Sequence, residues 1–151
     1  MINARAETVA EKPAFRSSFK KHRCLVMADG FYEWQKTEKE KQPFYIHLKS
    51  EKPMGFAGLY SIWTSPEGEE INTCTIIVTS ANELLSPIHD RMPVILDTND
   101  LDDWLNPAIE EPAKLLPLLK PYDGKKLELY KVSTKVNSPK NNSADLIKRI
   151  K

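Results

Sequence analysis

The sequence has few cysteines and histidines. Only two of its 151 residues are cysteines, and five are glycines. Because there is no Cys-x-x-Cys pair and no histidine pair at ligand spacing, the sequence predicts neither a structural metal site nor a bound cofactor. Cys24 and Cys74 each lie inside an apolar run, so we expect small buried thiols in the core, with a disulfide or a ligand role as alternatives.

Long apolar runs are also lacking. The longest runs are only a few residues, which is too short for a membrane-spanning helix, and no charged start followed by an apolar stretch predicts a signal peptide. The composition, 40% hydrophobic and 28% charged, is typical of one globular domain. We therefore expect one domain over residues 1–151, a monomer with a cytoplasmic location and no membrane partner.

Charge of one sign is not in excess. The chain has 22 Lys and Arg residues against 21 Asp and Glu residues, a net charge of +1, so a polyanion would have to bind a local basic patch. One basic cluster, FKKHR at 19–23 with Arg16 before it, could suit a nucleic-acid backbone if aromatic residues lie beside it. The alternative is an ordinary solvated face.

Short alternating segments predict an α+β fold. Strand patterns cover residues 24–28, 31–36, 43–49, 55–63, 71–79, 94–96 and 127–132. Short helices are expected at 14–22, 81–87, 98–105, 110–120 and 143–150. We expect a mostly antiparallel, meander-like, twisted and partly barrel-like sheet with short peripheral helices, and a sandwich is the alternative.

The segment DGFYEW places Glu33 between two aromatic residues. Strand alternation puts Phe31 and Glu33 on one face, and Tyr32 and Trp34 on the other. A carboxylate that shares a face with a phenyl ring is partly desolvated, which tends to raise its pKa and suits proton transfer near neutral pH. The alternative is a surface glutamate on an edge strand.

Two further groups of polar residues are candidates for a functional site. His89 follows a predicted helix in PIHDRMPVIL, where a loop on a rigid frame commonly places reactive groups, although it could instead bond a loop carbonyl. Asn3, Arg5 and Glu7 alternate near the start, so an extended backbone would project all three to one side, and an amide with a guanidinium could hold a phosphate. The same residues also suit a helix with a solvated face.

Several motifs in fixed order resemble the SOS-response-associated peptidase (SRAP) family of abasic-site processing proteins. They are INARAETVAEKPAFRSSFKKHRCLVMADGFYEW, FAGLYSIW, TIIVTSAN, IHDRMPVIL and WL, and they extend from Ile2 to about Leu105, with a fainter VN at 136–137. The resemblance implies an SRAP-like domain that acts on abasic sites in single-stranded DNA.

Members of that family begin with Met-Cys-Gly-Arg, and the cysteine that becomes N-terminal is their nucleophile. Neither Cys24 nor Cys74 can take that position, so the resemblance implies that this domain is N-terminally incomplete. It also implies a mechanism in which the cysteine amine forms a Schiff base with the opened sugar and the thiol closes a thiazolidine ring.

The resemblance further assigns roles to individual residues. Glu33 matches the glutamate that moves protons, His89 the histidine that assists ring opening, and Asn3 the asparagine that positions the cysteine. Arg5 and Arg91 match arginines that contact DNA phosphates. Autoproteolysis and an abasic-site lyase reaction would use the same groups. Without the cysteine, the alternatives are a non-covalent single-stranded DNA-binding module and a peptidase that acts on other proteins.

Overall fold

The computed structural model describes residues 2–151, which form two compact units. The first unit contains residues 2–27, 55–80 and 91–122, and the second contains residues 28–54, 81–90 and 123–151. Each unit is therefore assembled from segments that are distant in the sequence. Each also has its own sheet, and the two units are described separately.

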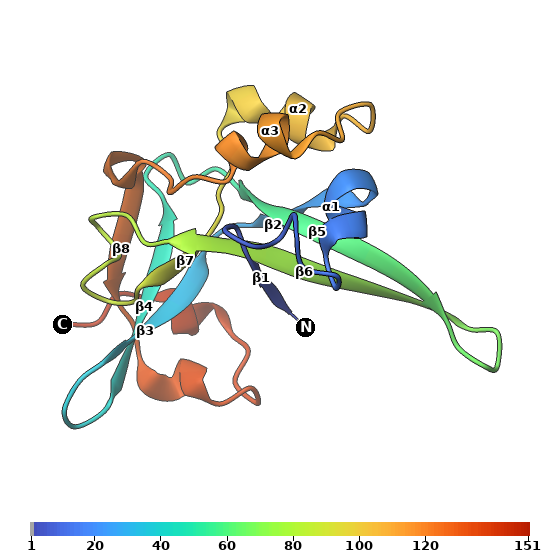
Figure 1. Cartoon of the computed structure of the whole chain (residues 1–151). Coiled ribbons are helices and arrows are strands. Elements are labelled where there is room, and N and C mark those ends of the chain that lie inside the picture. The colour runs from blue at the N-terminus through green and yellow to red at the C-terminus, as the bar shows by residue number, and fades with distance from the viewer. Residues whose placement is uncertain (1) are drawn as a thin grey trace. The chain divides into compact units, whose positions relative to one another are not determined.

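The first unit is built on a five-stranded sheet (Figure 1). Four strands follow the order β1-β6-β5-β2, and the fifth strand, β7, pairs with β6. β1 runs parallel to β6, whereas β5 and β7 are antiparallel to it. The strand bounds are Asn3–Arg5 (β1), Arg23–Ala28 (β2), Met54–Thr64 (β5), Glu70–Ser80 (β6) and Arg91–Pro93 (β7).

One face of this sheet carries the helices and the core of the first unit. Ala4, Leu59 and Ile77 lie on that face because side chains alternate along each strand, and all three are buried. Phe19 and Trp104 cover them from the helical side, with ring centroids 6.0 Å apart. The helices of this layer are α1 (Arg16–Lys21), α2 (Leu101–Leu105) and α3 (Pro112–Leu115), with 3-10 turns at Thr98–Asp100 and Leu116–Leu118.

Arg23 ties α1 to the segment that follows α2. Its guanidinium is buried and donates to five backbone carbonyls, at distances of 2.7 to 2.9 Å. These acceptors are the carbonyls of Phe19, Lys20, Trp104, Asn106 and Ile109. A guanidinium can be buried at this position because each of its five N–H donors is matched by a backbone carbonyl. The last residue of the basic cluster FKKHR is therefore structural.

The second unit is built on a three-stranded antiparallel sheet in the order β3-β4-β8. Its strands are Phe31–Lys36 (β3), Lys41–Leu48 (β4) and Leu127–Lys131 (β8), and 3-10 turns lie at Gly124–Lys126, Thr134–Asn137 and Ala144–Ile147. β3 is an edge strand, so Glu33 pairs on one side only, opposite Phe44. Ile46 and Leu127 are buried in this unit.

The turn before β3 depends on close packing. A Cβ atom at Gly30 would overlap the ring of Tyr45, so this position has no room for a side chain. Gly30 does not have a positive φ, unlike Gly68 in the β5–β6 hairpin. The Asp-Gly pair that the sequence predicts as a turn is therefore required for the approach of an aromatic ring and not for a left-handed backbone.

The α+β prediction is confirmed, and most predicted strands lie within a few residues of their observed bounds. The strands form two open sheets and not a single meander. The predicted helix at 81–87 is wrong, because hydrogen-bonded turns occupy this segment: the Asn82 side chain accepts from the Leu85 N–H, which replaces the first turn of a helix. Strand β7 lies at 91–93, and the predicted strand at 94–96 has a single bridge at Ile95.

The prediction of two buried thiols is also wrong. Both cysteines are free, and Cys74 is exposed while Cys24 is half-buried. Alternation on β6 explains the error, because Ile77 takes the core face and Cys74 the opposite face. Desolvation and the nearby Cys74 raise the pKa of the Cys24 thiol to about 11. Cys24 therefore stays protonated and is a poor nucleophile near neutral pH.

Candidate functional site

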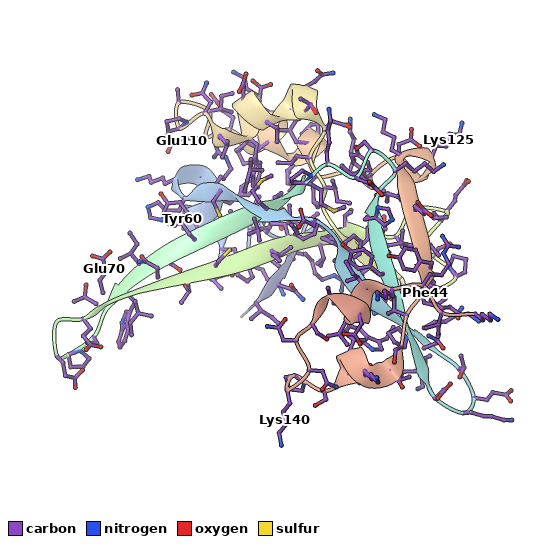
Figure 2. All side chains as sticks on the ribbon, turned by 180° about the vertical axis from the view of Figure 1, so that it is seen from behind. Phe44, Tyr60, Glu70, Glu110, Lys125 and Lys140 are labelled. Carbon is purple, nitrogen blue, oxygen red and sulfur yellow. The ribbon has the colours of Figure 1, made fainter. Side chains whose placement is uncertain are left out.

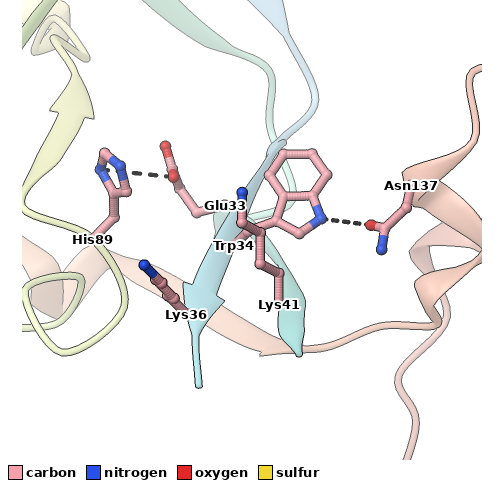
Figure 3. A pocket seen from close by; sticks show the side chains of 6 residues that line it. All are labelled: Glu33, Trp34, Lys36, Lys41, His89 and Asn137. Atoms are coloured by element: carbon pink, nitrogen blue, oxygen red, sulfur yellow. Dashed lines mark hydrogen bonds and ion pairs between the residues drawn. The ribbon is translucent and has the colours of Figure 1, made fainter. Parts of the chain in front are cut away.

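A pocket of about 620 Å³ opens in the second unit, beside the edge strand β3 (Figure 3). The side chains that line it are those of Glu33, Trp34, Lys36, Lys41, His89 and Asn137. They come from β3, β4, the turn segment 81–90 and the 3-10 turn at Thr134–Asn137. The pocket thus combines an acid, an imidazole, two ammonium groups, an amide and an indole.

Glu33 and His89 share this pocket. The Nδ1 atom of His89 lies 3.9 Å from Oε2 of Glu33 and 3.5 Å from Oδ1 of Asp90. The Glu33 side chain is 21% exposed, whereas that of His89 is 45% exposed. Gln35, on the same face of β3 as Glu33, donates to the carbonyl of Pro87 at 2.9 Å and so fixes the turn that carries His89. The half-buried setting predicted for Glu33 is confirmed.

Burial changes the acidity of Glu33. Desolvation raises the pKa of its carboxyl above the ordinary value, and the adjacent Asp90 adds to this effect. The charge of His89 and the N–H of Trp34 oppose the rise without cancelling it. A carboxyl whose pKa is raised holds its proton more readily than an exposed glutamate does, which suits a group that passes protons in general acid-base catalysis.

The opposite wall of the pocket is held by a contact that the sequence did not predict. The indole N–H of Trp34 donates to Oδ1 of Asn137 at 2.6 Å (Figure 3). Asn137 lies in a 3-10 turn far along the chain, and the only sequence signal for it was the VN dipeptide at 136–137. The bond fixes the plane of the indole at the mouth of the pocket.

Two lysines add positive charge to the pocket. Lys36 and Lys41 face each other directly across the β3–β4 pair. Like charges in this arrangement repel each other and destabilise a hairpin, so an anion between them would be stabilising. Neither lysine was a candidate in the sequence, where Lys36 ends a predicted strand and Lys41 lies between two predicted strands. Together they make the pocket suitable for a ligand with a phosphate.

The other three predicted site residues, Asn3, Arg5 and Arg91, belong to the first unit. Asn3 and Arg5 lie on β1, opposite Ile76 and Val78, on the sheet face that does not carry the core. The extended alternative is therefore confirmed for Asn3 and Arg5, and the Arg5 side chain is 65% exposed. Glu7 follows in a turn.

Arg91 forms an ion pair within the first unit. Its guanidinium donates two bonds to the carboxylate of Glu7, at 3.0 and 2.7 Å, and one to the carbonyl of Val78 at 3.0 Å. This pair lowers the pKa of the Glu7 carboxyl. A phosphate could reach Arg91 only by displacing a carboxylate, whereas Arg5 lies 3.8 Å from Glu7 and is more accessible.

Neither a metal site nor a membrane span is found in the described part of the chain. Within residues 2–151, no three His, Cys, Asp or Glu side chains are arranged to hold a metal ion. No helix in that range has the length and apolar character needed to cross a bilayer.

Comparison with known proteins supports the resemblance found in the motifs. The sequence model of the family described as "SOS response associated peptidase (SRAP)" matches residues 1–139. This chain belongs to the SRAP family. The match covers both Glu33 and His89, and it extends to the Trp34–Asn137 contact in the wall of the pocket.

Curated SRAP relatives are longer than this chain. "Abasic site processing protein YoqW" of Bacillus subtilis (strain 168) is 54% identical over 148 residues, which cover 97% of this chain and 66% of that protein. "Abasic site processing protein HMCES" of Xenopus tropicalis is 37% identical over 169 residues, covering 98% of this chain and 50% of that protein. This chain therefore spans two thirds or less of the length of these relatives.

A solved structure shares the SRAP fold described here. A protein from Bacteroides thetaiotaomicron matches with a TM-score of 0.91 and 37% identity, over 98% of this chain and 65% of that one. A protein from Bordetella bronchiseptica matches with a TM-score of 0.78 and 28% identity, over 87% of this chain and 64% of that one. Both cover part of a longer chain.

The raised pKa of Glu33 makes the stability of this SRAP chain depend on pH. Between the unfolded value, about 4.3, and the higher folded value, the folded state binds more protons, so the free energy of unfolding falls as pH rises. Glu33→Gln removes this loss. We expect the free energy of unfolding of Glu33→Gln, relative to that of the wild type, to increase as pH rises through this window and then to level off.

Urea unfolding of both proteins over a pH series measures this difference in free energy. A difference that does not change with pH would contradict the raised pKa of Glu33.

Proposed function

We propose that this chain processes abasic sites in single-stranded DNA, with the opened sugar of the site bound in the pocket between Glu33 and His89. The observation that carries this proposal is the pairing of a carboxyl of raised pKa with an imidazole 3.9 Å away, inside a pocket that also holds two lysines. Membership of the SRAP family and the names of the curated relatives support the choice of substrate.

The chemistry follows from the aldehyde form of an abasic sugar. The amine of an N-terminal cysteine attacks the aldehyde carbon, and water leaves as the Schiff base forms. The thiol then adds to the same carbon, and its proton passes to the nitrogen, which gives a thiazolidine. In this proposal Glu33 donates the proton that the departing water needs and accepts the proton of the attacking amine, and His89 stabilises the hydroxyl of the opened sugar.

In this proposal neither cysteine of the chain is the nucleophile. Cys24 and Cys74 are internal and so have no free α-amine, and the thiol of Cys24 is held protonated by its raised pKa. In the proposal, the cysteine belongs to the leading segment that the SRAP resemblance implies. Asn3 positions that cysteine, and Arg5 and Arg91 contact flanking phosphates. Autoproteolysis and strand cleavage by β-elimination would draw on the same acid and base.

A small molecule can replace the missing nucleophile in a test. Free cysteine carries the same amine and thiol, so the chain is mixed with free cysteine and an oligonucleotide that contains one abasic site. We expect the chain to accelerate thiazolidine formation on the oligonucleotide, as measured by mass spectrometry. An oligonucleotide with a tetrahydrofuran site, which has no aldehyde, is the control and should not react.

The outcomes separate the alternatives. Binding of single-stranded DNA without acceleration would overturn the proposal and leave a non-covalent binding module. Cleavage of unrelated peptides in the absence of DNA would indicate a general peptidase instead. Acceleration that is equally strong with a protein whose pocket residues are replaced would also contradict the assignment of the chemistry to Glu33.

A further inference from the structure

We propose that the helical face of the first unit is a second binding surface for single-stranded DNA, separate from the pocket at Glu33. In this proposal, which rests on the proposed function, Arg16, Lys20 and Lys21 hold backbone phosphates and Trp63 stacks on a base. None of these residues takes part in the chemistry described above.

The cationic part of the surface lies on α1. Arg16, Lys20 and Lys21 line one shallow hollow of about 330 Å³ together with Ala10 and Ser17, and all three basic side chains are exposed. Arg16 and Lys20 are four residues apart on the helix and therefore stand on the same side, where like charges repel. An anion that binds between these two side chains would remove their repulsion and so stabilise the folded state.

These cations are not neutralised by the protein itself. In the part of the chain from residue 2 to 151, none of the three forms an ion pair with a carboxylate. The nearby Glu110 acts on Arg23, which is buried and already bonded to five carbonyls. Since the net charge of the chain is only +1, attraction of a polyanion to this face must come from the local cluster.

The β5–β6 hairpin supplies an aromatic residue on the same face. Alternation along β5 places Trp63 on the side of Leu59, which is buried beneath the helical layer, and the Trp63 side chain is 55% exposed opposite Ile71. The hairpin extends as a two-stranded ribbon beyond α1, as the positions of Tyr60 and Glu70 show (Figure 2). The polar row between Leu59 and Trp63 contains Ser61 and Thr73, whose hydroxyls lie 3.1 Å apart.

Cations and an exposed indole on one face of a sheet favour a single strand over a duplex. Proteins that bind single strands without sequence preference combine a positive groove with aromatic side chains on which unstacked bases lie. A duplex would use the cations but offers no free base to the indole.

This surface lies on the opposite face of the sheet from Asn3 and Arg5. Ala4, between them on β1, points into the core beneath the helices, so its two neighbours point the other way. A strand that is held at Arg5 must therefore pass around the sheet to reach α1. We accordingly expect the second surface to increase affinity for long oligonucleotides and to have little effect on short ones.

The test compares two triple variants that lose the same charge. One carries Arg16→Gln, Lys20→Gln and Lys21→Gln, and the matched control carries Lys140→Gln, Lys148→Gln and Lys151→Gln. Affinity for a long oligothymidylate is measured over a range of salt concentrations. Because each phosphate contact contributes about 0.7 to the slope of log K against log salt for single strands, we expect the first variant to lose about 2 from that slope. The control should keep the wild-type slope.

The stacking contact of Trp63 is tested with single substitutions in the β5–β6 hairpin of the whole chain. Base stacking on an aromatic side chain corresponds to roughly a 5-fold or larger change in affinity, which we expect Trp63→Ala to remove for long oligothymidylate. Ile62→Ala is the matched control, because it alters a similarly exposed residue on the other face of β5. It should change the affinity less than Trp63→Ala does. Because both positions are solvent-exposed, both variants should fold as the wild type does.

Each outcome decides the proposal. An unchanged salt slope in the α1 variant, an equal loss in both triple variants, or no binding of the wild type at low salt overturns it. Equal effects of Trp63→Ala on duplex and single-stranded DNA would overturn the preference for single strands. Failure of the cysteine reaction together with a reduced slope in the α1 variant would remove the proposed abasic chemistry and leave this surface standing.

Discussion

Replacing Glu33 with glutamine should slow the chain-dependent reaction of cysteine with an abasic site by roughly 100-fold or more. Glutamine has nearly the same size and keeps a polar group beside His89, but it can neither donate nor accept a proton in the pH range of the reaction. The effect should appear in the rate at saturating DNA, because the carboxyl acts in the transition state and contributes little to ground-state binding.

Two control measurements distinguish a role of Glu33 in proton transfer from a role in DNA binding. The affinity of the variant for intact single-stranded DNA should stay within about 2-fold of the wild type, since phosphate contacts dominate such binding. Glu38→Gln is the matched control, because it removes an exposed carboxylate from the β3–β4 loop and should leave the rate unchanged. If Glu33→Gln weakened affinity as much as it slowed the reaction, Glu33 would be a binding residue and not a proton carrier.

Replacing Arg23 with methionine should destabilise the folded state by about 3 to 5 kcal/mol. The substitution keeps most of the side-chain length but removes five hydrogen bonds to backbone carbonyls, among them those of Phe19 and Trp104. Some of these carbonyls can turn toward water, so the loss stays below the sum of five separate bonds. Urea unfolding measures the change.

The control for this variant is an arginine on the surface. Arg149 donates to Glu128 at 2.8 Å and lies over the ring of Tyr130, yet its side chain is 63% exposed. Arg149→Met should therefore cost less than about 1 kcal/mol. Arg23→Lys is informative as well, because an ammonium has three donors and cannot reach all five acceptors. A loss of stability as small as that of Arg149→Met would show that the carbonyl network contributes little.

The sequence predicted Glu33 and His89 in the candidate site but not the other residues that line the pocket. Glu33 and His89 were both identified, because a charge between aromatic residues and a histidine in a turn before an apolar segment are local signals. Asn137 had no such signal, since its role depends on a tertiary contact with Trp34. The two lysines of the pocket gave no signal of a site, because only the cross-strand register brings them together.

The fold was predicted unevenly for similar reasons. Period-two patterns identified β3 and β8 to within one residue, because local alternation decides which residues are extended. The pattern could not show that these strands join a sheet separate from that of β5 and β6, since partner choice depends on contacts between distant segments. Arg23 was assigned to a basic surface for the same reason, because nothing near it in the sequence reveals the carbonyls of Trp104 and Ile109.

The parallel pairing of β1 with β6 has a consequence for the order of folding. β1 has only three residues, and its partners run from Ile76 to Val78, far along the chain from Asn3. Closing such a large loop costs entropy that three residues of pairing repay poorly, whereas the β5–β6 hairpin forms from neighbouring segments. The hairpin therefore offers a template on which β1 docks late, so Asn3 and Arg5 reach their positions only after most of the first sheet exists.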